Sequence, residues 1–253
     1  ADPRSYHTSR APPPELRGVA DGPHTVNAGP TIMLWGDSFA DMMQPAVDSA
    51  AENLHIHGIV ATQGGCPPFK GRVFAGSGAE VFSGCERYAN FVFDYFARTP
   101  SIRIVVIAGD WQRYEPQYEG GVLKQIVEIL ARRGGQMVFV SAVPNPYSDL
   151  PRLWARTQFQ AGHAIAEMTV DRQRQGAIIE RGMQIAAIAR QAGNVSVVDP
   201  FKTLCDAKAC FTVKNGRALF KDTDHLSQDG VGLIAPELES AITQTYAALI
   251  QER

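Results

Sequence analysis

The chain has 253 residues, a formal net charge of −2 and 20% charged residues. At 45% hydrophobic residues it has the composition of an ordinary globular protein, and its length is enough to bury one sizeable core. The basic residues are scattered along the sequence, which argues against the concentrated positive charge of a nucleic-acid-binding protein.

The N-terminal stretch 1–30 is rich in proline, glycine and polar residues and shows no sustained hydrophobic periodicity. It is predicted to be a linker or an extended arm, followed by a single domain over 31–253. It lacks the basic-then-apolar pattern of a signal peptide, and no later apolar run is long enough to cross a bilayer. We therefore expect a cytosolic protein, a processed protein, or a soluble piece of a longer one.

From Thr31 onward, short apolar runs alternate with helical patterns. The runs are continuous rather than alternating, which is typical of strands that are covered on both faces. The expected strands are 31–35, 56–62, 103–109, 136–143 and 194–200. The expected helices are about 41–54, 86–98, 119–133, 152–170 and 176–192. This order predicts an α/β fold with a five-stranded, mainly parallel sheet between two layers of helices.

Two further elements are expected after the fifth strand. The stretch 212–220 carries Asn215-Gly216 between apolar residues, which is a strong hairpin signal. An amphipathic helix over about 227–250 then closes the domain. No internal repeat is visible, so the chain is interpreted as one domain with an N-terminal arm.

The four cysteines form two local pairs, Cys66 with Cys85 and Cys205 with Cys210. Neither pair has the spacing of a structural zinc site, and no histidine lies close enough to complete one. The even count favours two disulfides, 66–85 and 205–210, in an oxidising compartment. Four buried free thiols are the alternative. We prefer the disulfides, and with them a processed or excised extracytoplasmic domain.

Gly36-Asp37-Ser38 stands directly after the first expected strand and before a helix. In doubly wound folds, ligands bind at the carboxyl ends of the strands, so Ser38 faces the expected crevice. At a helix N-terminus, free N–H groups and the helix dipole would stabilise a developing oxyanion. The alternative is that Ser38 only caps the helix. The triplet by itself therefore indicates a nucleophile only weakly.

Asp222 and His225 lie in a loop between the expected hairpin and the last helix. A nucleophilic serine needs an imidazole to accept its proton and a carboxylate to fix the tautomer of that imidazole. An aspartate three positions before the histidine can turn back to the ring nitrogen that faces away from Ser38, and Asp224 is the alternative orienting group. A solvated acidic loop with an incidental histidine is the competing interpretation.

Taken together, the Gly36-Asp37-Ser38 block and the Asp222-x-x-His225 block resemble the motifs of the SGNH (GDSL-like) hydrolase superfamily. The resemblance implies a flavodoxin-like fold in three layers. It also implies that Ser38 is the nucleophile, His225 its base and Asp222 the partner of that base. The chain order of serine, aspartate and histidine agrees with that family.

Finer details are similar to one branch, the extracytoplasmic SGNH domains fused to integral-membrane acyltransferases that O-acetylate cell-envelope glycans. The shared details are a Cys-Pro-Pro at 66–68, the later cysteine pair, and a Leu-Ser that follows His225. The resemblance spans about residues 31–250 and departs from the branch at Phe39, where many members carry histidine. It implies a periplasmic or extracytoplasmic, membrane-tethered domain, with the N-terminal arm leading from the membrane part.

One departure concerns the oxyanion. Most SGNH hydrolases carry Gly-x-Asn-Asp after the third strand, and its asparagine donates to the oxyanion, whereas this chain has no asparagine over 108–111. The oxyanion would then depend on the backbone N–H of Ser38 and on that of Gly64 or Gly65. Trp111, Arg113 and Tyr114 follow the same strand and are expected to contact a sugar. The alternative for the tryptophan is a plug between loop and core.

The leading interpretation is an O-acyltransferase domain whose partners are an acyl donor and a glycan acceptor. The acyl group, expected to be acetyl, would pass through an acyl-Ser38 intermediate to a hydroxyl of a cell-envelope polysaccharide. A carbohydrate esterase would use the same residues with water as acceptor, and the sequence does not separate the two. A catalytically silent glycan-binding module is the third interpretation, against which the intact trio argues. No pattern calls for a metal or a cofactor.

Overall fold

The computed structural model describes residues 17–19, 31–68, 79–113 and 116–251. Within them the main sheet has the strand order β1-β3-β2-β4-β5-β7. Its strands are β1 (Arg17–Val19), β2 (Ile32–Gly36), β3 (Gly58–Thr62), β4 (Ile104–Ala108), β5 (Gln136–Val140) and β7 (Val195–Val198). The last five are parallel, and β1 pairs antiparallel with β3 at the edge. The predicted five-stranded parallel sheet is confirmed.

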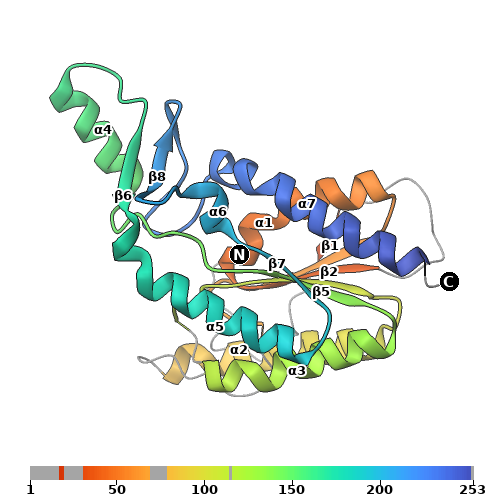
Figure 1. Cartoon of the computed structure of the whole chain (residues 1–253). Helices are drawn as coiled ribbons and strands as arrows, with labels where there is room; N and C mark the ends of the chain where they lie inside the picture. The colour runs from red at the N-terminus through yellow and green to blue at the C-terminus, as the bar shows by residue number, and fades with distance from the viewer. Residues whose placement is uncertain (1–16, 20–30, 69–78, 114–115, 252–253) are drawn as a thin grey trace.

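Helices cover both faces of this sheet (Figure 1). One face carries α1 (Ser38–Leu54) and α7 (Gln228–Gln251), and the other carries α2 (Ala79–Arg98), α3 (Pro116–Arg132) and α5 (Gly176–Ala192). Alternate residues of β2 belong to two separate hydrophobic clusters, Ile32 and Leu34 to the first and Met33 and Trp35 to the second. Both faces are therefore buried, which is why the strands read as continuous apolar runs.

A second, three-stranded sheet projects from one end of the molecule together with α4 (Leu150–Ala161) (Figure 1). Its order is β6 (Met168–Asp171), β8 (Ala209–Lys214), β9 (Arg217–Ala218). The single helix predicted over 152–170 is wrong in its second half. Gly162 adopts φ +73° and its N–H donates to the carbonyl of Gln158, so α4 ends there and the chain returns as β6.

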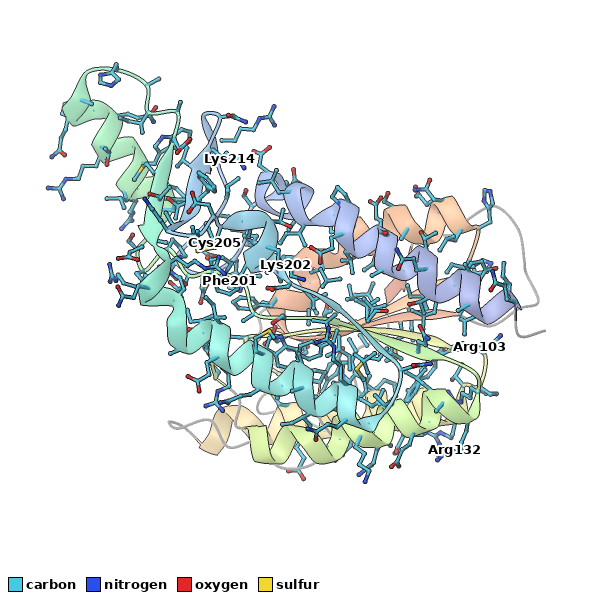
Figure 2. All side chains as sticks on the ribbon, in the orientation of Figure 1. Arg103, Arg132, Phe201, Lys202, Cys205 and Lys214 are labelled. Atoms are coloured by element: carbon cyan, nitrogen blue, oxygen red, sulfur yellow. A yellow bond between two sulfur atoms is a disulfide. The ribbon has the colours of Figure 1, made fainter. Side chains whose placement is uncertain are left out.

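The predicted hairpin forms between β8 and β9. Asn215 and Gly216 both have positive φ, 52° and 69°, as a two-residue hairpin turn requires. Lys214 lies next to this turn in the projecting part (Figure 2). Two short elements, η2 (Arg172–Gln175) and α6 (Pro200–Leu204), precede α5 and β8 respectively and complete the described structure.

Three residues of the predicted arm, 17–19, form β1 on the edge of the sheet. The rest of stretch 1–30 lies outside the described residues, and the division into arm and domain stays a prediction. Among the described helices, none combines the length and apolar character needed to cross a membrane.

Both predicted disulfides are present, and the alternative of free thiols is wrong. Cys66–Cys85 ties the turn after β3 to α2, and Cys205–Cys210 closes a short loop between α6 and β8. Cys205 lies at the end of α6, close to Phe201 (Figure 2).

Candidate functional site

The carboxyl end of β2 passes directly into α1. At this junction the backbone of Gly36 packs closely against the end of β4 and the first turn of α1. A Cβ at Gly36 would lie 1.9 Å from the carbonyl oxygen of Ala108 and 2.6 Å from the Cβ of Ala40. Only glycine therefore lets β2, the end of β4 and the first turn of α1 approach this closely. Ser38, as the first residue of α1, is held at the carboxyl edge of the sheet.

Asp37 fixes the same turn through both of its carboxylate oxygens. Oδ1 accepts the backbone N–H of Phe39 at 2.7 Å, and Oδ2 accepts the backbone N–H of Asp110 at 2.8 Å. The side chain is 1% exposed. Asp37 is thus both the N-cap of α1 and the link to the loop that follows β4, and Ser38 sits next to it in the chain.

The loop between β9 and α7 carries the other predicted residues. Its base is closed by Ser227, whose backbone N–H donates to the carbonyl of Leu219 at 2.9 Å. Leu226 is buried and its N–H points to the sulfur of Met42 on α1 at 3.3 Å. The loop is therefore docked on the helix that begins with the serine.

The structure brings Ser38, His225 and Asp222 together in one hydrogen-bonded chain. Nε2 of His225 lies 2.7 Å from Oγ of Ser38, and Nδ1 lies 2.9 Å from Oδ2 of Asp222. A carboxylate only accepts hydrogen bonds, so Nδ1 carries the proton and the unprotonated Nε2 accepts from the serine hydroxyl. This is the arrangement in which an imidazole can take the proton of an attacking serine.

Asp222 is held as an anion by its own loop. Its Oδ1 accepts the backbone N–H groups of Asp224 at 3.0 Å and of His225 at 2.7 Å. Burial raises the pKa of Asp222, but these two hydrogen bonds and the charge of His225 outweigh it, so the pKa lies below its ordinary value. The spacing Asp-x-x-His is what allows this turn, because the carboxylate reaches forward to the next N–H groups.

Asp224, the alternative orienting group, also contacts the imidazole. Its Oδ1 lies 2.9 Å from Nδ1 of His225. Its Oδ2 lies 3.7 Å from Nη2 of Arg113, whose Nε in turn lies 2.7 Å from Oδ2 of Asp110. Burial raises the pKa of Asp110, with Arg113 opposing the rise and Asp224 adding to it.

The three residues after β4 that were predicted to contact a substrate differ in their placement. Trp111 is 1% exposed, stacks on Phe139, and donates its indole N–H to the carbonyl of Val140 at 2.8 Å. Its prediction as a sugar contact is therefore wrong, because the buried carbonyl draws the ring into the core. Arg113 is exposed and lies beside the loop between β9 and α7 that carries His225, called the histidine loop below. Tyr114 lies outside the described residues.

The predicted oxyanion donors lie at the same edge of the sheet. Gly64 and Gly65 form an exposed turn after β3, in which Gly65 has φ +70°. The turn is tied to β2 by Gln63, whose N–H donates to the carbonyl of Gly36 at 3.1 Å. A contact of these glycine N–H groups with an oxyanion stays a prediction.

Sequence reasoning missed an exposed aromatic residue at this end of the sheet. Tyr147, in the loop after β5, has φ +59° and is 42% exposed. Its hydroxyl donates to the carbonyl of Arg174 at 2.5 Å, and the Arg174 guanidinium lies 4.7 Å from its ring centroid. Three residues later the N–H of Leu150 points to the carbonyl of Asp222 at 3.4 Å. The Asn-Pro-Tyr sequence indicates a turn, but not an exposed ring beside the histidine loop.

A groove of about 480 Å³ runs between α1 and α7 and begins next to the histidine loop. Leu226 and Ser227 line its near end, and Met42 and Val231 contribute to its apolar wall. Its wall at Met42 lies about one helical turn from Ser38 along α1, so the groove adjoins the site.

Among the described residues, one cluster could hold a metal ion, formed by Asp222, Asp224 and His225 with ligand atoms within 4.8 Å of one another. Both ring nitrogens of His225 already have hydrogen-bond partners.

A parallel α/β/α sheet, with a serine after the first core strand and a histidine before the last helix, defines an SGNH-type domain. The profile of the family described as SGNH domain (fused to AT3 domains) matches residues 6–240, and the chain belongs to this family. The expected superfamily and branch are thereby confirmed. No curated protein matches the chain.

Two solved structures share the fold. The periplasmic domain of the lipopolysaccharide acetyltransferase of Salmonella ser. Paratyphi A has a TM-score of 0.65 and 17% identity, over 86% of this chain and 85% of that chain. A protein of Slackia heliotrinireducens assigned as an SGNH hydrolase has a TM-score of 0.50 and 16% identity, over 84% of this chain and 98% of that chain. At such identities the likeness supports the fold alone.

Proposed function

We propose that this chain is an O-acyltransferase domain that transfers an acyl group, expected to be acetyl, to a hydroxyl of a cell-envelope polysaccharide. The observation that carries the proposal is the contact of Ser38 Oγ with His225 Nε2 at 2.7 Å, with a carboxylate on the far side of the ring. This geometry prepares a nucleophile, because each group has the partner that its role in acyl transfer requires.

The first half-reaction forms the acyl-enzyme. Oγ of Ser38 attacks the carbonyl carbon of the acyl donor, and its proton moves to Nε2 of His225. The carbonyl becomes a tetrahedral oxyanion, and its collapse breaks the bond to the leaving group, which takes the proton from Nε2. Asp222 stabilises the imidazolium that exists between these two proton transfers.

The second half-reaction repeats the steps with the acceptor. A glycan hydroxyl loses its proton to Nε2 of His225 while its oxygen attacks the acyl carbonyl carbon. Collapse of the second tetrahedral intermediate releases the acylated glycan, and the proton returns to Oγ of Ser38. No further reactant is needed for the bonds and protons to balance.

The oxyanion of both intermediates is assigned to the N-terminal end of α1. The cap formed by Asp37 uses the N–H of Phe39, which leaves the N–H of Ser38 for the oxyanion, and Gly64 or Gly65 supplies a second donor from the neighbouring turn. A missing side-chain donor raises the barrier of each step that forms this oxyanion by about 2.7–4 kcal/mol, so acylation and deacylation should both be slow.

The wider setting is inferred from the family. Its domains occur fused to AT3 domains, and the structurally similar Salmonella protein is a periplasmic domain of a lipopolysaccharide acetyltransferase. Two disulfides are consistent with an oxidising, extracytoplasmic compartment. We infer an integral-membrane acyltransferase as the N-terminally fused partner, with the arm 1–30 leading from it.

The test supplies the protein with an activated acetyl ester and an envelope polysaccharide, and measures acetylated sugar and free acetate, with Ser38→Ala as the control. Acetylated sugar formed by wild type and absent with Ser38→Ala supports transfer. Free acetate as the only product, also dependent on Ser38, replaces the proposal with a carbohydrate esterase. If neither product exceeds the Ser38→Ala background, acyl transfer is contradicted and the interpretation as a glycan-binding module is favoured.

A further inference from the structure

Two carboxylates lie beside Nδ1 of His225. Asp222 accepts its N–H, with Oδ2 at 2.9 Å and Oδ1 at 3.1 Å, and Oδ1 of Asp224 lies 2.9 Å from the same nitrogen in an ion-pair contact. Asp222 therefore holds the hydrogen bond, and Asp224 adds a second negative charge against the ring. In a serine triad with one carboxylate, loss of that group lets the ring take the wrong tautomer. Here a second carboxylate already lies at contact distance from Nδ1.

The two carboxylates differ in their surroundings. The side chain of Asp222 is 42% exposed, and its Oδ1 is also occupied by two backbone N–H groups. The side chain of Asp224 is 21% exposed, so its charge is less screened by water. The charge of Asp224 is therefore the less screened of the two, while Asp222 holds the hydrogen bonds to the ring.

A closed ring of contacts positions Asp224. Starting from Ser38, the ring runs through His225 and Asp224 to Arg113, then to Asp110, whose backbone N–H donates to Asp37, the neighbour of Ser38. It joins the N-terminus of α1, the loop after β4 and the histidine loop. The charged groups facing His225 are therefore Asp222 and Asp224 from its own loop, and Arg113 and Asp110 from the loop after β4.

We propose that Asp224 is a second orienting carboxylate for His225, and that Arg113 sets how much of the charge of Asp224 the imidazole experiences. Both are positioning residues, since neither touches the reacting atoms. The inference rests on the proposed function, because it assigns these residues a part in the acylation of Ser38. It predicts that either carboxylate alone keeps the productive tautomer and that the loss of both does not.

The test is the rate of acetylation of Ser38 by an activated acetyl ester, measured over about pH 5 to 8, where a histidine base titrates. Asp222→Asn and Asp224→Asn should each lower the rate by about 10- to 100-fold, since each removes one charge beside the ring. The double variant should lose about 10⁴-fold, the loss expected when no carboxylate fixes the tautomer.

The pH profile separates positioning from a merely structural role. With Asp224→Asn the acid limb of the profile should move to lower pH, because the imidazolium loses an anion. With Arg113→Gln it should move to higher pH, because Asp224 loses its counter-charge. Asp229→Asn on α7 breaks an ion pair with Arg217 of β9, so it removes the same charge elsewhere and should move neither limb.

Each outcome decides one point. If the double variant is no slower than Asp222→Asn and the profile of Asp224→Asn matches wild type, the role of Asp224 is overturned. If Asp224→Asn lowers the rate equally at every pH and the acid limb stays in place, the residue is only structural and the inference again fails. If wild type itself forms no acetyl-Ser38, the proposed function fails instead.

Discussion

Asp37→Ala should destabilise the domain and impair its nucleophile at the same time. The carboxylate is buried, accepts the N–H of Phe39 at 2.7 Å and accepts the N–H of Asp110 at 2.8 Å. Alanine removes both acceptors. The first N–H belongs to the helix terminus, and the second is a buried donor that alanine leaves without this partner.

The magnitude follows from these two contacts. Loss of an N-cap costs about 1 kcal/mol, within a range of 0.5–2. A buried donor left unsatisfied costs about 1–3 kcal/mol. Together they give about 2–4 kcal/mol, which in a domain of this size corresponds to a fall in Tm of roughly 5–15 °C. Asp37→Asn keeps one acceptor oxygen and should lie between alanine and wild type.

The assay combines thermal unfolding with the rate of acetylation of Ser38. A displacement of the nucleophile by about 1 Å can reduce the rate by about 10²-fold, so the variant should be slow even at temperatures where it is fully folded. Asp149→Ala is the matched control for stability, because Asp149 caps α4 through the N–H of Arg152 from an exposed position and should cost about 1 kcal/mol only. An Asp37→Ala variant that unfolds within about 1 °C of wild type and acetylates at the same rate would refute the reasoning.

Four further predictions concern the site and its supports. His225→Ala removes the proton acceptor and should lower the rate of acetylation by at least about 10⁴-fold, and a rate within tenfold of wild type removes the residue from the mechanism. Because the fold lowers the pKa of Asp222, its carboxylate stabilises the protein above about pH 4, and this contribution is lost as the pH falls through the lowered pKa. In urea unfolding, the difference in unfolding free energy between Asp222→Asn and wild type should therefore shrink on acidification. A difference that grows instead would contradict this. Replacing both cysteines of the 66–85 disulfide with serine opens a 19-residue link and should lower the unfolding free energy by about 3 kcal/mol, which an unchanged denaturation midpoint would disprove. Tyr147→Ala should weaken binding of a glycan acceptor by about 3- to 10-fold, as measured by calorimetry. Phe159→Ala, which removes another exposed aromatic ring on α4, should not weaken it. Equal effects of the two variants would show that the loop after β5 has no role in binding the acceptor.

The parallel sheet could be predicted because burial on both faces leaves a simple trace in the sequence. Each of the runs in β2, β4 and β5 consists almost entirely of apolar residues, and helices of 17 to 20 residues lie between them. The half-exposed strand β6 leaves no such trace, since its residues alternate between intermediate and exposed positions. Gly162 was visible in the sequence, but its positive φ, which ends α4, was not.

The cysteine pairing could be predicted because each pair is local. A separation of 19 residues for the first pair and 5 for the second leaves little choice of partner once the chain is compact. The edge strand over 17–19 could not, because three residues without an apolar pattern become a strand only when the edge of β3 is available to them.

The candidate site was predictable in its residue types and not in its details. Gly-Asp-Ser after a strand and Asp-x-x-His before a helix indicate which groups meet, since parallel strands bring their carboxyl ends to one edge. The direction of a side chain from that edge is set by tertiary contacts. Trp111 turns inward to the carbonyl of Val140, while Arg113, two positions later, turns to the carboxylates of Asp110 and Asp224.

The central claim is that the hydroxyl of Ser38 becomes covalently acylated. The most direct measurement is peptide mapping by mass spectrometry after brief incubation of the folded, disulfide-bonded domain with an activated acetyl ester. The account predicts an added acetyl group on the peptide that contains Ser38, greatly reduced in His225→Ala and absent in Ser38→Ala. An unmodified peptide across several such esters, or a label on another residue that persists in Ser38→Ala, would contradict it.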